Sequence, residues 1–134
     1  MTQLEQVFEF NKFGGQDVSH TPRMIDEEKF NLQLGLIQEE LDELAEAYRN
    51  RDMVEIVDAL VDIEYVLLGM VCRLGLQNEF VLGFEEVHQN NMTKIFDKDD
   101  NLIVQFREDG KILKPEGYQS VNLANKFPYL KNIK

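Results

Sequence analysis

The chain has 134 residues, 43% hydrophobic and 29% charged, which predicts one folded domain and excludes a disordered chain. Its net charge of −11 disfavours binding to nucleic acid or to anionic membranes, because both are bound chiefly by basic patches. One cysteine excludes a disulfide framework, and the lack of a long apolar stretch or a secretory signal pattern predicts a cytoplasmic protein without a membrane segment.

Four helices are expected from apolar residues spaced three and four apart and from capping residues. They lie at about residues 2–13, 27–49, 53–74 and 78 to between 91 and 94. Thr2, Asp26 and Asp52 are the expected N-caps, and Gly14 and Gly75 follow two of the C-termini. The third helix is apolar almost all the way round, so we expect it to be central and buried.

Beyond residue 96 the helical period is lost. Residues 102–106 are predicted as a short strand, Asp109-Gly110 as a turn, and the remainder as an extended arm. The predicted fold class is all-α: a four- to five-helix bundle over residues 1–96, with an irregular C-terminal arm over 97–134 that completes the same domain. Residues 1–89 carry a net charge of −13 and residues 90–134 a net charge of +2, so the arm is the part suited to phosphates.

A stripe of carboxylates on the third helix is the strongest indication of a functional site in the sequence. Glu55, Asp58 and Asp62 fall within about 60° of one another on a helix with little other polar surface. Ionised carboxylates are not buried without partners, and like charges four residues apart repel. These side chains are therefore expected to be protonated, paired with cations or bound to a metal, and we favour the metal.

The second helix carries a matching set. Glu39, Glu40 and Glu43 span about 100° of its surface and border its apolar face, with Glu39 farthest toward solvent. If the two helices pack antiparallel, both sets converge on one acidic metal site between helices 2 and 3. Carboxylates without imidazole or thiolate suit a hard cation, so Mg²⁺ is expected, with Mn²⁺ as an alternative. Asp42 and Glu46 are interpreted as a solvated face.

These residues resemble a known family. The segment LIQEELDEL contains E-E-x-x-E, and EIVDALVD supplies E-x-x-D eleven residues after Glu43. Together with FEEVHQNNMTKI and EDGKILKPEGYQ, they resemble the MazG-like all-α nucleoside triphosphate pyrophosphohydrolases. That superfamily also contains dimeric dUTPases and phosphoribosyl-ATP pyrophosphohydrolase. The resemblance covers about residues 30–118.

The resemblance implies roles for individual residues. Glu40, Glu43, Glu55 and Asp58 match the family positions that bind Mg²⁺. Glu39 matches the first glutamate of the motif, which implies a base for the attacking water or a further ligand. Asp62 has no place in the minimal motif; we place it with the substrate-binding residues, while a supporting role or metal binding stays open. The other substrate-binding candidates are Asn91, Lys94, Lys111, Lys114 and Tyr118.

The implied reaction converts a nucleoside triphosphate and water to the monophosphate and pyrophosphate, as in the removal of unwanted nucleotides. No G-x-x-x-x-G-K-[ST] motif is present, so metal and lysines are expected to hold the phosphates. A homodimer or homotetramer is expected to cover the apolar third helix. Two alternatives stay open: a non-catalytic helical module that binds metal or nucleotide, and a phosphoribosyl-ATP pyrophosphohydrolase, which the N-M-T-K segment and the long arm disfavour.

Overall fold

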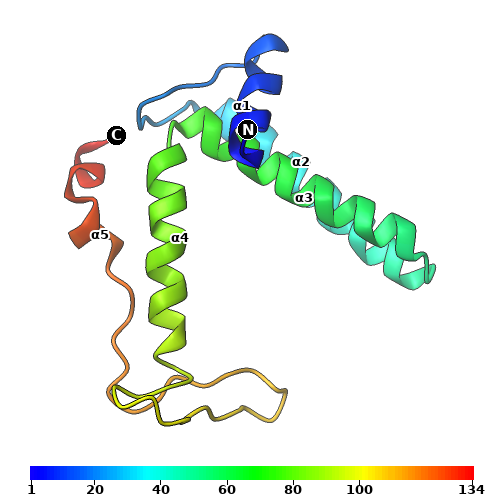
Figure 1. The fold of residues 1–134 in the computed structure, drawn as a ribbon. Coiled ribbons are helices and arrows are strands. Elements are labelled where there is room, and N and C mark those ends of the chain that lie inside the picture. Colours follow the sequence, from blue (N-terminus) through cyan, green and yellow to red (C-terminus); the bar gives the residue numbers. More distant parts are fainter. The chain divides into compact units, whose positions relative to one another are not determined.

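The computed structural model describes residues 1–134. Its helices are α1 (Gln3–Phe13), α2 (Glu27–Arg49), α3 (Met53–Leu74), α4 (Gln77–Met92), α5 (Leu123–Lys126) and the 3-10 helix η1 (Pro128–Asn132) (Figure 1). No β-strand forms, so the predicted all-α class is confirmed. The chain divides into a first unit, Met1–Gln77 with Ile133–Lys134, and a second unit, Asn78–Asn132.

The helix ends are fixed by the capping residues that the sequence predicts. Thr2 forms a capping box with Glu5, in which each side chain accepts a 3.1 Å hydrogen bond from the other's backbone N–H. Asp26 and Asp52 cap α2 and α3 more simply: each side chain accepts a hydrogen bond from one backbone N–H, that of Lys29 and of Glu55 respectively. Gly75 ends α3 at φ 67°, and a Cβ atom there would lie 2.0 Å from the carbonyl oxygen of Thr21. Only glycine therefore fits this position.

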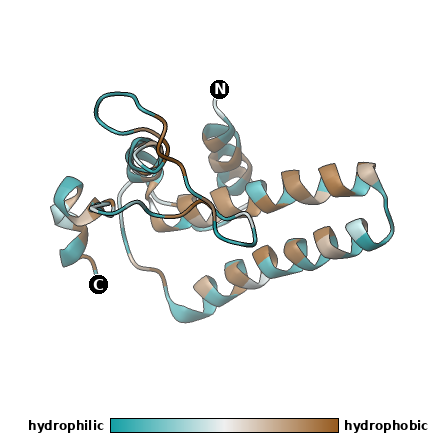
Figure 2. Cartoon of the chain, turned by 90° about the horizontal axis from the view of Figure 1, so that it is seen from below, coloured by the Kyte–Doolittle hydropathy of each residue, from teal (hydrophilic) through white to brown (hydrophobic).

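The two long helices of the first unit form an antiparallel hairpin joined by residues 50–52. Hydrophobic residues recur along both helices (Figure 2). Near the hairpin turn the buried residues are Ala47 and Ala59, whose small side chains let the two backbones approach closely. Helix α1 packs against α3, where Val7 is 2% exposed. The hairpin is thus the rigid frame on which the acidic residues sit.

A buried polar network holds this frame together. Arg73 is 5% exposed, and its guanidinium donates hydrogen bonds to the side-chain oxygens of Gln33 at 2.9 Å and Gln16 at 2.5 Å. Gln33 in turn donates to the backbone carbonyl of Val66 at 2.7 Å. Buried polar groups need such partners to offset the loss of water. The network therefore ties α2, α3 and the loop after α1 to one another.

The prediction that α3 is buried all round is wrong for the single chain. Its apolar side chains divide between a face covered by α2 and α1 and an uncovered face. The uncovered residues, 39–76% exposed, are Met53, Val54, Val57, Leu60, Val61 and Leu67. At about 100° per residue they share a stripe roughly 140° wide. The chain has no further helix in the first unit to cover this stripe.

In the second unit, the arm returns along α4. The predicted turn at Asp109-Gly110 forms, with Gly110 at φ 90°, but the predicted strand over 102–106 is wrong. Only two isolated bridges form, Phe96 with Leu102 and Phe106 with Ile112, so no ladder develops. The expectation of an extended arm to the end of the chain is also wrong, because α5 and η1 form.

Contacts with α4 hold α5 and η1 in place. Phe127 is 5% exposed and lies over Gly83, the buried residue of α4. Lys126 pairs with Glu86 at 2.8 Å, and the hydroxyl of Tyr129 donates to Glu79 at 2.5 Å. None of the helices has both the length and the apolar composition of a bilayer-spanning segment.

Candidate functional site

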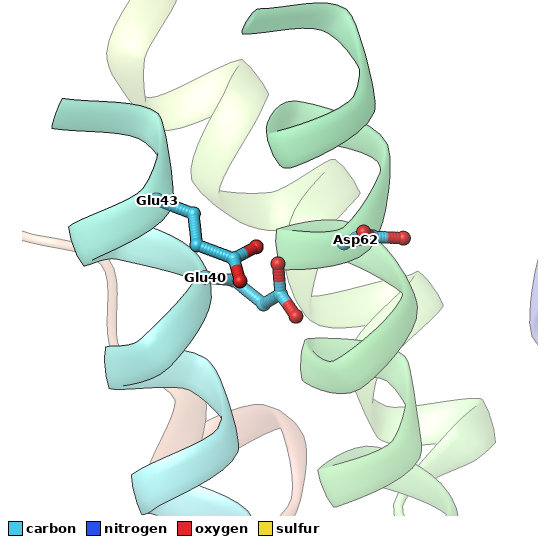
Figure 3. A group of neighbouring side chains, drawn as sticks. All are labelled: Glu40, Glu43 and Asp62. Atoms are coloured by element: carbon cyan, nitrogen blue, oxygen red, sulfur yellow. The ribbon is translucent and has the colours of Figure 1, made fainter. Parts of the chain in front are cut away.

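Three carboxylates from the two helices of the hairpin meet in one group. Glu40 and Glu43 are three residues apart on α2 and reach toward α3, which carries Asp62 (Figure 3). One carboxylate oxygen of each residue lies within 4.8 Å of the others. Because the helices are antiparallel, the α2 residues just before the turn face α3 residues just after it. The predicted acidic site between the second and third helices is therefore present.

The electrostatics of the group are unfavourable without a cation. The pKa of Glu40 is raised to about 7, first by burial and then by its hydrogen bond with the Glu43 side chain and by the negative charges of Glu43, Asp62 and Asp58. Its Oε2 atom is buried without a hydrogen-bond partner. None of the five ion pairs in the structure involves these carboxylates. A buried oxygen with no partner, surrounded by like charge, fits a hard divalent cation, which takes carboxylate ligands.

A cavity of about 330 Å³ adjoins this group near the turn of the hairpin. It is lined by Glu43, Glu46, Ala47, Asn50, Glu55, Asp58 and Ala59. Glu43 belongs to both the carboxylate group and the cavity, whereas Glu55 and Asp58 are exposed on the cavity wall. The four residues predicted to bind metal are thus divided between the two places, and Asp62, predicted to bind substrate, lies beside Glu40 and Glu43.

Two polar residues of this cavity, Glu46 and Asn50, were not predicted from the sequence as site residues. Glu46 is exposed, as expected of a solvated face, yet it lines the cavity together with Asn50. Glu46 and Asn50 follow Glu43 by three and seven residues, a spacing that places Glu43, Glu46 and Asn50 on one side of the helix. This spacing is the sequence signal that could have assigned them to the cavity wall. Glu39, in contrast, is exposed and belongs neither to the carboxylate group nor to the cavity wall.

The second unit brings together another set of predicted residues. The ammonium of Lys94 lies 5.3 Å from the ring centroid of Tyr118, and that of Lys114 lies 5.9 Å from the same centroid. The hydroxyl of Tyr118 donates a hydrogen bond to Oδ1 of Asn90, and Nδ2 of Asn90 donates to the carbonyl of Gln119 at 2.7 Å. Three of the predicted substrate-binding residues therefore form one cluster, which we call the tyrosine–lysine cluster (Lys94, Lys114 and Tyr118).

The other two predicted residues of this unit lie outside the cluster. Asn91 is exposed, and it is the preceding residue, Asn90, that bonds to the arm. Lys111 is exposed as well; its backbone amide bonds to Asp109 in the turn. Sequence reasoning missed Asn90, since the choice between adjacent asparagines depends on where the arm returns to α4.

Comparison with known proteins agrees with the acidic motifs. The family model for phosphoribosyl-ATP pyrophosphohydrolase matches residues 7–91, well over half of the chain. This segment contains every carboxylate of the group and of the cavity, and it ends before Lys94 and the arm. No curated protein matches the chain. The chain therefore belongs to the phosphoribosyl-ATP pyrophosphohydrolase family of the MazG-like nucleoside triphosphate pyrophosphohydrolase superfamily, whose reaction is the hydrolysis of phosphoric anhydrides.

Proposed function

We propose that the protein is a Mg²⁺-dependent pyrophosphohydrolase that converts a nucleoside triphosphate to its monophosphate and pyrophosphate, and so clears unwanted nucleotides from the cytoplasm. Mn²⁺ is the alternative ion. One observation supports this most: in a chain of a pyrophosphohydrolase family, the buried and unpartnered oxygen of Glu40 lies among further carboxylates. That arrangement is costly for a structural helix pair and useful for an enzyme that must hold a cation.

We assign metal binding and proton transfer to different residues of the hairpin. Glu40, Glu43 and Asp62 would hold the ion together with Glu55 and Asp58 of the adjoining cavity. When bound, Mg²⁺ neutralises phosphate charge and lowers the pKa of a coordinated water. Glu39 is the proposed acceptor of that water's proton, since its exposed carboxylate is free of ion pairs.

The substrate is the finer part of the proposal. The matched family is named for phosphoribosyl-ATP, which makes that nucleotide the second candidate. The match ends at residue 91, however, so Met92, Thr93 and Lys94 of the N-M-T-K segment and the whole arm lie beyond what the chain shares with that family. Because the tyrosine–lysine cluster lies in this additional part, we favour a nucleoside triphosphate as the substrate.

Pyrophosphate release tests the proposal. The protein is incubated with a panel of nucleoside and deoxynucleoside triphosphates and with phosphoribosyl-ATP, in Mg²⁺ or in EDTA, and pyrophosphate is converted to phosphate and quantified. We expect Mg²⁺-dependent release from triphosphates, with the highest kcat/KM for one base. Release from phosphoribosyl-ATP alone would support the second candidate. No release from any substrate would leave a non-catalytic module that binds metal or nucleotide.

We further propose that the protein is at least a homodimer, with a tetramer as the alternative, and that a second copy covers the uncovered stripe of α3. Six large apolar side chains, each 39–76% exposed, share this stripe, and a contiguous exposed apolar patch is typical of a protein–protein contact. The same stripe on an identical partner is self-complementary, as a twofold interface requires.

Val57→Glu should therefore weaken self-association by at least about tenfold, since it buries an unpaired charge in the proposed interface. Light scattering coupled to gel filtration over a dilution series measures this change. Gln38→Glu adds the same charge at an exposed polar position of α2 and serves as the matched control. A parent protein that is monomeric throughout the series would contradict the proposal.

A further inference from the structure

We propose that Asn90 is the positioning residue of an oligophosphate-binding site formed by the tyrosine–lysine cluster. The inference rests on the proposed function only for its ligand, which is the triphosphate of the substrate or the pyrophosphate it releases. The site itself is built entirely within the second unit, from α4 and the arm.

Both polar atoms of the Asn90 side chain form hydrogen bonds with the arm. Its Nδ2 donates to the backbone carbonyl of Gln119 at 2.7 Å, and a carbonyl can only accept. The amide orientation is thereby fixed, so Oδ1 is the atom that faces Tyr118 and accepts from its hydroxyl. One half-buried side chain on α4 thus holds two consecutive arm residues that lie 28 and 29 positions further along the chain.

The arm itself presents Tyr118 to Asn90 through a tight turn. The backbone N–H of Tyr118 donates to the carbonyl of Pro115 at 3.1 Å, and Gly117 has φ 78°. A side chain at residue 117 would be strained in this left-handed region. The turn and the two hydrogen bonds of Asn90 together leave the Tyr118 ring little freedom, which is what a fixed platform for other groups requires.

Two lysines converge on this platform without an anionic partner. The ring face of a tyrosine attracts cations, and the ammonium groups of Lys94 and Lys114 both lie within 6 Å of its centroid. Neither lysine takes part in any of the five ion pairs of the structure. Two like charges held around one ring repel each other, and an anion bound by both removes that repulsion.

A cavity of about 290 Å³ provides room for a ligand beside the cluster. Its walls include Asn90, Thr93 and Tyr118 together with the turn at 115–117, which carries the carboxylate of Glu116; Lys94 and Lys114 lie beside the cavity, at the ring of Tyr118, and not in its walls. Because lysines hold phosphates as point charges, a ligand with several negative charges should bind better than a monophosphate. The chemistry of the site therefore favours an oligophosphate.

Calorimetric titration of the full chain with tripolyphosphate in EDTA measures this site without metal. We expect Asn90→Ala to weaken binding about tenfold and Tyr118→Phe, which keeps the ring, about fivefold. The double variant should bind about as weakly as Asn90→Ala alone, because Asn90 acts through Tyr118. Lys94→Ala and Lys114→Ala should each weaken binding and reduce its salt dependence.

Gln89→Ala is the matched control, since this exposed neighbour bonds only to Glu85 of its own helix and should leave the dissociation constant unchanged. Unchanged binding by Asn90→Ala, or effects of Asn90→Ala and Tyr118→Phe that simply multiply, would overturn the inference. A purely structural role would lower the melting temperature while leaving the dissociation constant intact, and this too would overturn it.

Parallel titrations identify the source of the phosphate and separate this inference from the proposed function. Tighter binding of a non-hydrolysable triphosphate analogue than of pyrophosphate supports a substrate site, and the reverse supports a product site. Asn90-dependent binding in a protein that releases no pyrophosphate would refute the proposed function alone. Mg²⁺-dependent hydrolysis with KM and the tripolyphosphate dissociation constant unchanged in Asn90→Ala would refute the positioning role alone.

Discussion

Glu43→Gln should reduce Mg²⁺-dependent pyrophosphate release by at least about 100-fold while the helical content is retained. Glu43 belongs to both the carboxylate group and the adjoining cavity, so its loss affects every proposed arrangement of the ion. A metal ion contributes several kcal/mol to stabilising charge in the transition state, and each 1.36 kcal/mol is about tenfold in rate. Steady-state kinetics at saturating Mg²⁺ measure kcat, and circular dichroism measures the fold.

Asp42→Asn provides the matched control for this experiment. Asp42 is the preceding residue of the same helix, is exposed, and accepts a hydrogen bond only from Gln38. Its substitution removes the same charge from α2 and should leave kcat within about twofold, since isolated surface substitutions have small effects. Near-parental turnover by Glu43→Gln would place the site elsewhere, and equal losses in both variants would indicate a general effect of charge.

The loss of pyrophosphate release should also depend on which carboxylate is substituted, and it should be larger for Glu40 than for Glu55 or Asp58. Glu55 and Asp58 line the cavity but are exposed, whereas Glu40 has a buried oxygen without a partner. The structure thus separates the carboxylate group of Glu40, Glu43 and Asp62 from the exposed carboxylates of the cavity wall. The spacing of the motifs alone does not make this distinction.

The helices were predictable because their boundaries depend on local chemistry. A side chain such as Asp26 or Asp52 bonds to a backbone N–H three residues away, and Gly75 must adopt a left-handed conformation. Such signals need no knowledge of the rest of the chain. The four-residue helix α5 has only Asn122 as a cap, too weak a signal to distinguish it from an irregular arm.

The site was predictable in part. Helical spacing alone brings Glu40 and Glu43 to the border of the apolar face of α2. That Asp62 faces them depends on the register of α2 against α3, which no single helix encodes. The same holds for Asn90, whose partners lie 28 and 29 residues away. Periodicity also cannot tell an apolar face covered within the chain from one left for another subunit, as the exposed side of α3 demonstrates.

Glu40→Gln should stabilise the metal-free protein at pH 8 and flatten its dependence on pH. In the folded protein burial and the neighbouring carboxylates raise the pKa of Glu40 from 4.5 to about 7, so between these values the folded state holds a proton that the unfolded state releases. Stability from this group is therefore fully present below about pH 4.5 and is lost as the pH rises through 7. Glutamine never ionises, so the variant avoids this loss.

Thermal unfolding in EDTA at pH 5 and pH 8, at one protein concentration, measures the difference. Because Glu40 is half-buried, we expect the variant to melt about 5 °C above the parent at pH 8 and close to it at pH 5. Glu39→Gln removes a neighbouring exposed charge and separates the effect of burial from that of net charge. Added Mg²⁺ should raise the melting temperature of the parent at pH 8 and that of Glu40→Gln far less, because binding to the folded state alone stabilises it. A parent whose melting temperature at pH 8 is unaffected by Mg²⁺, or a variant less stable than the parent in EDTA, would mean that the charge of Glu40 is satisfied within the protein and that no cation is needed there.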